Sequence, residues 1–440
     1  MMTAREAALA ALERCRRDGA WSGSSIDGII KKYELDRREA ALASRLCLGV
    51  LQNSALCDFY IAAYCSLEPK RLEPKLHDIL LIGAYQLLFL DRMPARAAVN
   101  ETVSLSKKCG SARTTGLVNA VLRRIAENKA ADTLPEIPGK GSAEYLSIKY
   151  SHPQWLAERI IAEQGYDFAE GFFACNNRPA PLTLQVNTLK VSAEAYHDML
   201  VSAGIEHTRD ENLPDCISLE GGIVSELPGY DDGLFYVQDR AARMAVELAA
   251  PQKGMRALDA CSAPGGKAFA AAIKMQNEGR VLACDIHEKK LGLIENGAKR
   301  LGIDIIETAA MDARQCDEEL LSAFDLVIAD VPCSGLGVIA KKPEIRAKSE
   351  EELAKLPEIQ YDILNNLARY VKPGGVLLYS TCTVLRAENE DIVNRFIAEH
   401  GEFELEKIDC CGIRAESGMY CFWPNVDATD GFFAAKLRRK

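Results

Sequence analysis

Two cysteines follow strand-like stretches of the sequence, at positions from which a thiol could act on a substrate. The stretch "FDLVIADVPCSG" (324–335) is an apolar strand that ends at Asp330 and continues into Cys333, and "GGVLLYSTCTV" (374–384) is an apolar strand that ends near Cys382. Ligands of open α/β sheets bind at the carboxyl ends of the strands. We therefore expect both thiols to face one site.

Transfer of a group to carbon 5 of a pyrimidine is a reaction that needs such a thiol. Carbon 5 is a poor nucleophile until a thiolate adds to carbon 6, and the thiol is eliminated afterwards. The attacking cysteine must have a lowered pKa in a partly open site, and Asp330 could hydrogen-bond the ring nitrogen and exocyclic amine of a cytosine. The residues alone leave open whether Cys333 or Cys382 attacks, and each cysteine taken singly is typical of a packed small hydrophobe.

A glycine-containing loop between a strand and a helix predicts a ligand-binding turn. In "ALDACSAPGGKAFAAAI" (257–273), Gly265 and Gly266 allow the backbone to approach a ligand, and Lys267 begins the helix. The Gly-x-Gly-x-x-Gly spacing of a dinucleotide site and the spacing of a P-loop are both absent. The loop therefore indicates a nucleoside ligand of another kind.

Acidic residues end four successive predicted strands: Asp259, Asp285, Asp312 and Asp330. Asp285 could accept hydrogen bonds from both ribose hydroxyls of a nucleoside, and Asp312 could reach an adenine amino group. Carboxylates are rarely buried unpaired, and they would repel the phosphates of a dinucleotide. A cationic adenosyl ligand such as S-adenosylmethionine accounts for them better.

The patterns that position these residues divide the chain into three parts and a linker. From 233 to 440, strands alternate with helices, which predicts a doubly wound, mostly parallel sheet. Residues 1–128 carry apolar positions at helical spacing and predict an all-helical domain. Residues 129–143 are a linker with two prolines and two glycines. Residues 144–232 predict a small α+β module with a strand at 182–190.

Charge is unevenly distributed along the 440 residues. The chain carries a net charge of −10, but residues 1–130 have a balance of +6 and the remainder −16. The basic helical part is therefore expected to contribute RNA affinity that falls with salt. In the acidic middle module, RNA contacts would depend on single residues such as Arg178, Asn187 and Lys190.

Several classes of protein are not expected. The fifteen cysteines are odd in number and contain no Cys-x-x-Cys pair, and only six histidines are present, so neither a disulfide framework nor a metal site is predicted. The apolar stretch 79–90 is too short to span a membrane and predicts a buried helix. The N-terminal segment lacks an apolar signal core. We expect a cytoplasmic monomer.

Several motifs together carry a family resemblance. The methyltransferase-like motifs are "YVQDRAAR" (236–243), "DACSAPGGK" (259–267), "DVPCSGLG" (330–337), "STCTV" (380–384) and "TDGFFAAKL" (429–437). They resemble the signature set of the RNA (cytosine-5)-methyltransferases. The stretches "AAVNETVSLSKK" (97–108) and "LVNAVLRRI" (117–125) resemble the NusB antitermination fold, and the combination covers nearly the whole chain.

This resemblance implies a fold, a cofactor, a substrate and roles for single residues. The fold would be a NusB-like helical domain, a small α+β RNA-binding module and a Rossmann-like class I methyltransferase domain, and the substrate a cytosine in 16S ribosomal RNA. Cys382 would be the nucleophile, Cys333 would assist product release, and Asp330 and Lys267 would complete the catalytic set. The resemblance assigns these residues to S-adenosylmethionine: Cys261, Ser262, Ala263, Pro264, Gly265, Gly266, Lys267, Asp285, Asp312 and Asp330.

The chain departs from the family pattern in one segment, and alternatives remain. In "KKPEIRAKSEEELAKLPEIQ" (341–360), Ala347 stands where a tryptophan is expected, so the RNA contact could be remade by Lys341, Lys342 and Arg346 or the segment could be a solvated loop. The substrate could instead be a transfer RNA or another ribosomal cytosine. A non-catalytic RNA-binding antitermination or assembly factor is the alternative class, and DNA cytosine-5 methyltransferases, which attack with the Pro-Cys cysteine, provide the rival assignment of Cys333.

Overall fold

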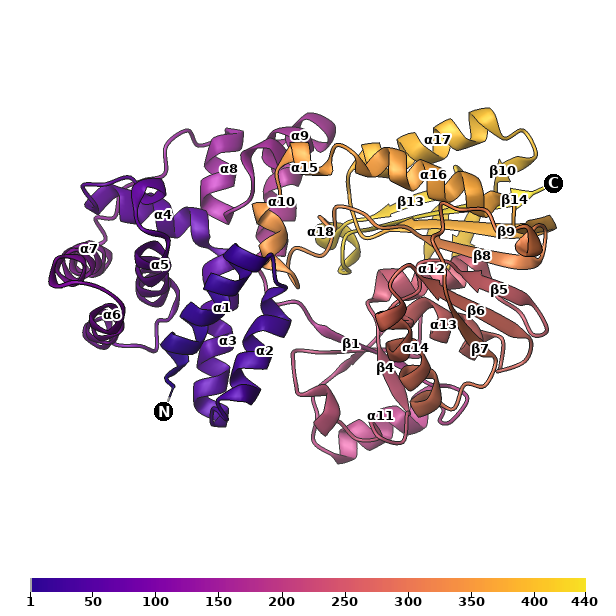
Figure 1. Cartoon of the computed structure of the whole chain (residues 1–440), viewed down its shortest axis with the longest axis horizontal. Helices are drawn as coiled ribbons and strands as arrows, with labels where there is room; N and C mark the ends of the chain where they lie inside the picture. The colour runs from indigo at the N-terminus through magenta and orange to yellow at the C-terminus, as the bar shows by residue number, and fades with distance from the viewer. Residues whose placement is uncertain (1) are drawn as a thin grey trace. The chain divides into compact units, whose positions relative to one another are not determined.

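The computed structural model describes residues 2–440 and divides into two compact units (Figure 1). The first comprises the chain up to Arg178 together with Ile339–Glu350. The second comprises Pro179–Val338 and Glu351–Lys440. Residues 144–232, which we propose from the sequence as one module, are therefore divided at Arg178: the part before this boundary, which is helical, belongs to the first unit, and the part after it, with the strands, belongs to the second.

The first unit is helical, and its first seven α-helices share one core of buried alanine, leucine and isoleucine side chains. Polar caps mark where helices begin: Thr3 and Glu6 form a reciprocal capping box, and Asp36 accepts from the backbone N–H groups of Arg38 and Glu39. The helices are α1 (Ala4–Asp18), α2 (Ser22–Lys32), α3 (Arg37–Gln52), α4 (Ser54–Tyr64), η1 (Pro69–Arg71), α5 (Pro74–Phe89), α6 (Ala95–Cys109), α7 (Ala112–Ala130), α8 (Ala143–Tyr150), α9 (Gln154–Gln164) and α10 (Tyr166–Asn176).

The apolar stretch 79–90 lies mostly in α5, and its side chains are largely buried, as the sequence predicts. Within residues 2–440, no single helix has both the length and the apolar composition needed to cross a membrane. The consecutive helices α3 and α4, bent by 79° at their junction, meet that criterion only when taken together.

Ile339–Glu350, which we call the returning segment, leaves the second unit and belongs to the first. Its short helix η4 (Pro343–Ala347) carries Arg346, whose guanidinium donates to the carbonyl of Gln52 at 3.0 Å and to the carbonyl of Asn176 and the Oδ1 of Asn177 at 3.2 and 2.6 Å. Burial lowers the pKa of Arg346 to about 9. The hypothesis that Arg346 contacts RNA is therefore wrong in this structure, because its donors serve the first unit.

Two other residues of the returning segment also contact the first unit. Glu344 accepts from the backbone N–H and the hydroxyl of Ser22 at 3.1 and 2.6 Å, and the Lys342 ammonium lies 4.7 Å from the centroid of the Trp21 indole. A lysine over an aromatic face is a favourable cation–π contact. The returning segment, which includes the first part of the stretch that departs from the family pattern, thus packs on helices of the first unit.

The second unit begins with a small antiparallel sheet of order β2-β3-β1-β4. Its core lies between these strands and α11. Of the residues considered above as RNA contacts, Asn187 has a buried amide that donates to the carbonyls of Gly233 and Leu301. The exposed Lys190 ammonium donates to the carbonyls of Asp232 and Arg300, and its contact with RNA stays a prediction. The elements are β1 (Leu182–Val186), α11 (Ala193–Ser202), β2 (Thr208–Arg209), β3 (Cys216–Leu219), η2 (Val224–Glu226) and β4 (Phe235–Val237).

The larger sheet has eight strands in the order β10-β14-β9-β8-β5-β6-β7, with β13 paired to β14. Strands β5 to β9 pair in parallel, and β14 joins β9 antiparallel. Its elements are α12 (Arg240–Ala249), β5 (Arg256–Asp259), α13 (Gly266–Lys274), β6 (Arg280–Asp285), α14 (Glu288–Leu301), β7 (Ile306–Ala310), η3 (Glu318–Leu320), β8 (Phe324–Asp330), α15 (Glu350–Leu353), α16 (Leu356–Ala368), β9 (Val371–Thr381), η5 (Arg386–Glu388), α17 (Glu390–Glu399), β10 (Phe403–Leu405), the hairpin β11 (Ile408–Cys410) and β12 (Ile413–Ala415), β13 (Met419–Phe422), α18 (Pro424–Asp427) and β14 (Phe432–Arg439).

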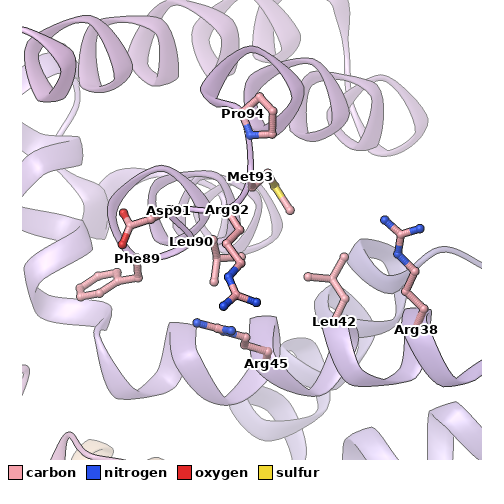
Figure 2. A pocket seen from close by; sticks show the side chains of 9 residues that line it. All are labelled: Arg38, Leu42, Arg45, Phe89, Leu90, Asp91, Arg92, Met93 and Pro94. Atoms are coloured by element: carbon pink, nitrogen blue, oxygen red, sulfur yellow. The ribbon is translucent and has the colours of Figure 1, made fainter.

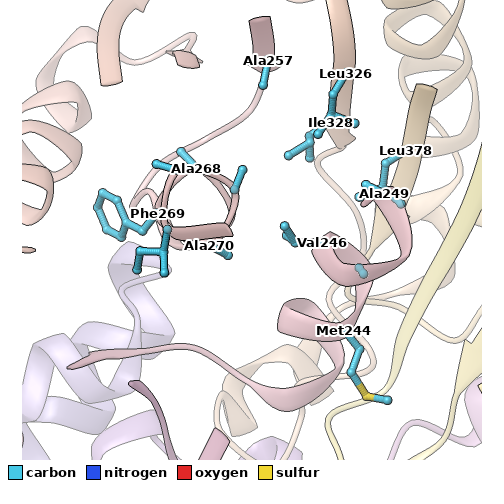
Figure 3. Close-up of a cluster of buried hydrophobic side chains, with 14 of the residues drawn as sticks. Met244, Val246, Ala249, Ala257, Ala268, Phe269, Ala270, Leu326, Ile328 and Leu378 are labelled. Carbon is cyan, nitrogen blue, oxygen red and sulfur yellow. The ribbon is translucent and has the colours of Figure 1, made fainter. Parts of the chain in front are cut away.

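Both faces of this sheet are buried, as a parallel sheet requires. Along β8, Leu326 and Ile328 pack with α12, α13 and α14, whereas Val327 and Ala329 pack on the opposite face with α16 and α17. Figure 1 shows the two helical layers, and Figure 3 shows part of the first core. The predicted multidomain fold, with a helical N-terminal part and an α/β C-terminal part, is confirmed.

Candidate active site

The carboxyl ends of four parallel strands are held side by side by backbone hydrogen bonds beyond the strands themselves. Ser262 N–H donates to the carbonyl of Cys284 at 2.7 Å, which joins the ends of β5 and β6. Val331 N–H donates to the carbonyl of Ser380 at 3.1 Å, which joins the ends of β8 and β9. Because β8 lies between β5 and β9, the predicted site residues meet at one edge of the sheet.

The two cysteines of interest are in contact. The Sγ atoms of Cys333 and Cys382 lie 3.2 Å apart, neither cysteine is in a disulfide, and both side chains are half-buried. Gly337 N–H donates to the carbonyl of Cys382 at 3.0 Å, and a Cβ on Gly337 would lie 1.8 Å from the carbonyl oxygen of Gly431. The close packing of two glycines therefore lets the Cys333 loop approach the end of β9.

The charged groups near Cys333 differ from those near Cys382. The hydrogen bond with Cys382, burial, and the negative charges of Glu388 and Asp330 raise the pKa of Cys333 well above its usual value. Lys267 lies close enough to Cys382 for their charges to interact. The acids near Cys333 thus disfavour its thiolate, whereas the Lys267 ammonium is a charge that attracts a thiolate at Cys382.

Lys267 and Asp330 form an ion pair beside the thiols. Lys267 Nζ lies 2.7 Å from Asp330 Oδ2, and the hydroxyl of Ser380 donates to Asp330 Oδ1 at 2.8 Å. Burial alone would lower the pKa of Lys267, but the Asp330 carboxylate outweighs it and raises the pKa above its ordinary value. The ammonium also lies 5.0 Å from the centroid of the Phe432 ring. Lys267 is thus a fixed positive charge in the site.

The loop that precedes α13 has the shape that its glycines predict. Gly265 has a φ of +111°, and its N–H donates to the carbonyl of Ser262 at 2.7 Å. A Cβ at Gly265 would meet the Phe269 ring at 2.5 Å, so the position excludes larger residues. Burial and nearby acids raise the pKa of Cys261 far above its usual value, which makes this third thiol of the site unreactive.

The acids at the strand ends are of two kinds. Asp259 is buried beneath the loop, and desolvation, together with the charge of Asp330, raises its pKa to about 7. Asp285 accepts from His287 N–H at 2.9 Å, and Met311 N–H donates to the carbonyl of Asp285, which brings the end of β7 alongside. Asp312 binds Arg314 through both oxygens, and this pairing lowers the pKa of Asp312 to about 2.

A buried carboxylate that the sequence interpretation missed connects the two cysteine loops. Glu388 Oε2 accepts from Ser334 N–H at 2.9 Å and from the amide of Gln360 at 2.7 Å, and the same amide donates to the carbonyl of Pro332. The hydroxyls of Ser334 and Thr383, each adjacent to one cysteine, lie 2.7 Å apart. Glu388 therefore acts as a positioning residue for the thiol pair.

We expect Glu388→Ala to lower the free energy of unfolding by about 3 kcal/mol, because two buried donors would lose their acceptor. The exposed Asp391 pairs with Arg386 of the preceding short helix η5, so Asp391→Ala should change stability by less than about 0.5 kcal/mol. Denaturant unfolding of both variants measures the difference. Equal stability of the two variants would contradict the positioning role.

Comparison with known proteins assigns each part of the chain. Residues 2–127 match the NusB family, residues 152–225 match the RsmF/B-like methyltransferase ferredoxin-like domain, and residues 246–438 match the 16S rRNA methyltransferase RsmB/F. Among the described residues 2–440, no cluster of His, Cys, Asp and Glu could hold a metal ion.

Relatives match along the full length. The probable ribosomal RNA small subunit methyltransferase B of Bacillus subtilis is 33% identical, with 99% of this chain and 98% of the relative covered, and the ribosomal RNA small subunit methyltransferase B of Sodalis glossinidius is 33% identical over 94% of each chain. The crystal structure of PH0851 superposes with a TM-score of 0.84 at 27% identity, covering 99% of this chain and 98% of that one. The chain therefore belongs to the ribosomal RNA small subunit methyltransferase B family, and its activity is the methylation of ribosomal RNA with a cofactor of the S-adenosylmethionine type.

Proposed function

We propose that the protein methylates carbon 5 of a cytosine in 16S ribosomal RNA through a covalent adduct with Cys382. The observation that carries this proposal is the contact of Cys382 with Cys333, 3.2 Å between the sulfurs, beside the Lys267–Asp330 ion pair. Methylation of a nitrogen or an oxygen needs no thiol nucleophile. Two thiols at the strand ends, next to a fixed charge pair, suit the addition and elimination that carbon 5 requires.

The residues at the ends of β5, β6 and β7 fit S-adenosylmethionine, which supplies the methyl group when bound. We assign the loop Cys261–Lys267 to the methionine part, Asp285 to the ribose hydroxyls and Asp312 to the adenine amino group. The donor set supports this assignment, because Asp285 and Asp312 offer carboxylate oxygens at adjacent strand ends. Arg314 now occupies both Asp312 oxygens, so it would have to turn away for Asp312 to accept from adenine.

The first steps follow from the charges around the thiols. The Lys267 ammonium stabilises the thiolate form of Cys382, and the protonated Cys333 donates a hydrogen bond to it. The Cys382 sulfur forms a bond to carbon 6 of the cytosine, and the electrons of the 5,6 double bond move toward carbon 5. As negative charge builds up on the ring, the ring nitrogen takes up a proton from solvent, and the Asp330 carboxylate accepts hydrogen bonds from the protonated ring nitrogen and from the exocyclic amine. Carbon 5 thereby becomes the nucleophile.

Once carbon 5 carries the methyl group, release of the product reverses the addition of Cys382. The proton on carbon 5 leaves to a base, its bonding electrons restore the 5,6 double bond, and the bond between Cys382 and carbon 6 breaks. We assign Cys333 to this step because its Sγ lies beside the departing sulfur and can hydrogen-bond the thiolate that forms. Glu388 keeps the two loops in the relative position that this step needs.

Methyl transfer to RNA from a deletion strain tests the proposal. Purified protein with labelled S-adenosylmethionine should label 16S ribosomal RNA from that strain and leave RNA from the parent strain unlabelled. Bisulfite sequencing should then find one cytosine that is protected in the parent and unprotected in the deletion strain. Labelling of transfer RNA or of another ribosomal RNA would show that 16S ribosomal RNA is not the substrate. A label on a base nitrogen would contradict methylation of carbon 5.

We expect Asp285→Ala to weaken the binding of S-adenosylmethionine by about 1 to 3 kcal/mol, because the ribose hydroxyls would lose a buried acceptor. Asp304 is a matched control, since it is an exposed acid just before β7, at the opposite end of the sheet. Calorimetric titration of both variants with the cofactor measures the effect. An unchanged affinity of Asp285→Ala would mean that the ribose is held elsewhere.

A further inference from the structure

The first unit contains a pocket of about 670 Å³ that the methyltransferase reaction does not use (Figure 2). It lies between α3 and the connection that follows α5. Arg38 and Arg45 are separated by two turns of α3 and therefore project from one face of the helix, with Leu42 between them. Arg92 comes from the connection between α5 and α6. Three guanidinium groups thus line one cavity.

These charges are not neutralised by neighbouring acids. Within residues 2–440, none of the three arginines forms an ion pair with a carboxylate, although the hydroxyl of Tyr85 interacts with Arg45. Asp91 is the acid in the lining, and Lys129 binds it at 3.2 Å. Figure 2 shows Arg45 and Arg92 pointing toward one another, with Asp91 at the left beside Phe89. Like charges in this arrangement create a positive potential that an anion would relieve.

The rest of the lining is apolar. Leu42, Phe89 and Met93 contribute half-buried side chains, and the volume lies within the range of about 300 to 1,000 Å³ that is usual for small-ligand sites. Guanidinium groups bind phosphate oxygens through paired N–H donors. Apolar and aromatic surfaces accept the faces of unstacked bases. One or two nucleotides of a single strand combine both features.

We propose that this pocket, the arginine pocket, binds the backbone phosphate and a base of single-stranded ribosomal RNA at a distance along the RNA from the methylated nucleotide. This inference rests on the proposed function, because it assumes that the RNA substrate also contacts the helical unit. It extends that function by naming a second contact point. An acidic protein segment fits less well, since a carboxylate side chain offers no planar ring for the apolar part of the lining.

RNA binding by a triple variant of the full-length protein tests this inference. The variant is Arg38→Gln/Arg45→Gln/Arg92→Gln, and the charge-matched control is Arg113→Gln/Arg123→Gln/Arg124→Gln, whose arginines are exposed on α7 outside the pocket. The probe is unmodified 16S ribosomal RNA transcribed in vitro. The affinity of the pocket variant should fall by at least about tenfold at low salt, and the slope of log K against log salt should fall by about two to three. The control should lose less than threefold.

Two further readouts separate this inference from the proposed function. The pocket variant should bind S-adenosylmethionine as the wild type does and should reach the wild-type kcat at saturating RNA, because none of its changes lies in the second unit. Single variants Arg38→Gln and Arg92→Gln should each lose part of the affinity if the triple variant does not fold. If the wild type methylates RNA, and the pocket and control variants bind RNA equally well, the proposal that the arginine pocket binds RNA is wrong. If the wild type binds RNA but transfers no methyl group, the proposed function is wrong, whereas RNA binding by the arginine pocket is not contradicted.

Discussion

Replacing Cys382 by alanine is expected to abolish methyl transfer, with a loss on the order of 10⁴-fold or more, because the covalent route through carbon 6 disappears. No covalent complex with RNA should form. Cys333→Ala should still attack and methylate, but the elimination should slow, so that a complex of protein and RNA accumulates and survives a denaturing gel. Because the two sulfurs lie 3.2 Å apart, each variant keeps one thiol in the same site, and the two variants can be compared directly.

The rival assignment predicts the opposite pattern. If Cys333 attacked, as the Pro-Cys cysteine does in DNA cytosine-5 methyltransferases, a complex would be trapped by Cys382→Ala and lost in Cys333→Ala. Cys316→Ala is the control, since Cys316 is an exposed thiol of the same unit. Both site variants should be incubated with the RNA and labelled cofactor before electrophoresis. A labelled complex in the Cys382→Ala lane would disprove our assignment.

Asp330→Asn is expected to lower kcat by about 10² to 10³-fold, because an amide lacks the negative charge that stabilises the protonated ring nitrogen of the activated cytosine. The same change leaves the Lys267 ammonium without its counterion at 2.7 Å, in a place where its side chain is 11% exposed. Removal of one partner of a largely buried ion pair is destabilising. We therefore expect a lower unfolding midpoint together with the loss of rate.

The opposite end of the same strand provides the control for that experiment. Asp325 pairs with Lys372 at 2.7 Å, just as Asp330 pairs with Lys267, but it lies where β8 begins, and both its side chain and that of Lys372 are about one-third exposed. Asp325→Asn should keep kcat and change stability only slightly. Single-turnover methylation and thermal unfolding of both variants measure these effects. Wild-type kcat in Asp330→Asn would show that the carboxylate has no part in the reaction.

The elements of the larger sheet could be predicted because each carries a local signal. Most of the parallel strands are short apolar runs followed by acids, and the carboxyl ends of parallel strands share one edge of the sheet, so the placement of Cys333 and Cys382 at that edge could be predicted from two strand ends. The contact of the two sulfurs could not be predicted in this way, because it also requires that β8 and β9 be neighbours, which no local pattern reports.

Other features depend on contacts between distant parts of the chain, which no local pattern reports. Glu388 stands in a polar stretch that reads as a surface turn, yet its carboxylate is buried by Gln360 and Ser334. Asparagine is a residue type that is common in exposed turns, but the amide of Asn187 donates hydrogen bonds to two backbone carbonyls in the interior. The spacing of Arg38 and Arg45 on α3 was visible in the sequence, whereas the third guanidinium, Arg92, joins them only in the folded unit.

The returning segment affects how the helical unit can fold while the chain is being synthesised on the ribosome. A chain is made from its N-terminus, and domains generally fold as they emerge. The helical unit, however, includes Ile339–Glu350, and the carbonyls of Gln52 and Asn176 receive their donor only when Arg346 has been synthesised. These two acceptors must therefore stay in contact with water until Arg346, which follows β5 to β8 in the chain, has left the ribosomal tunnel.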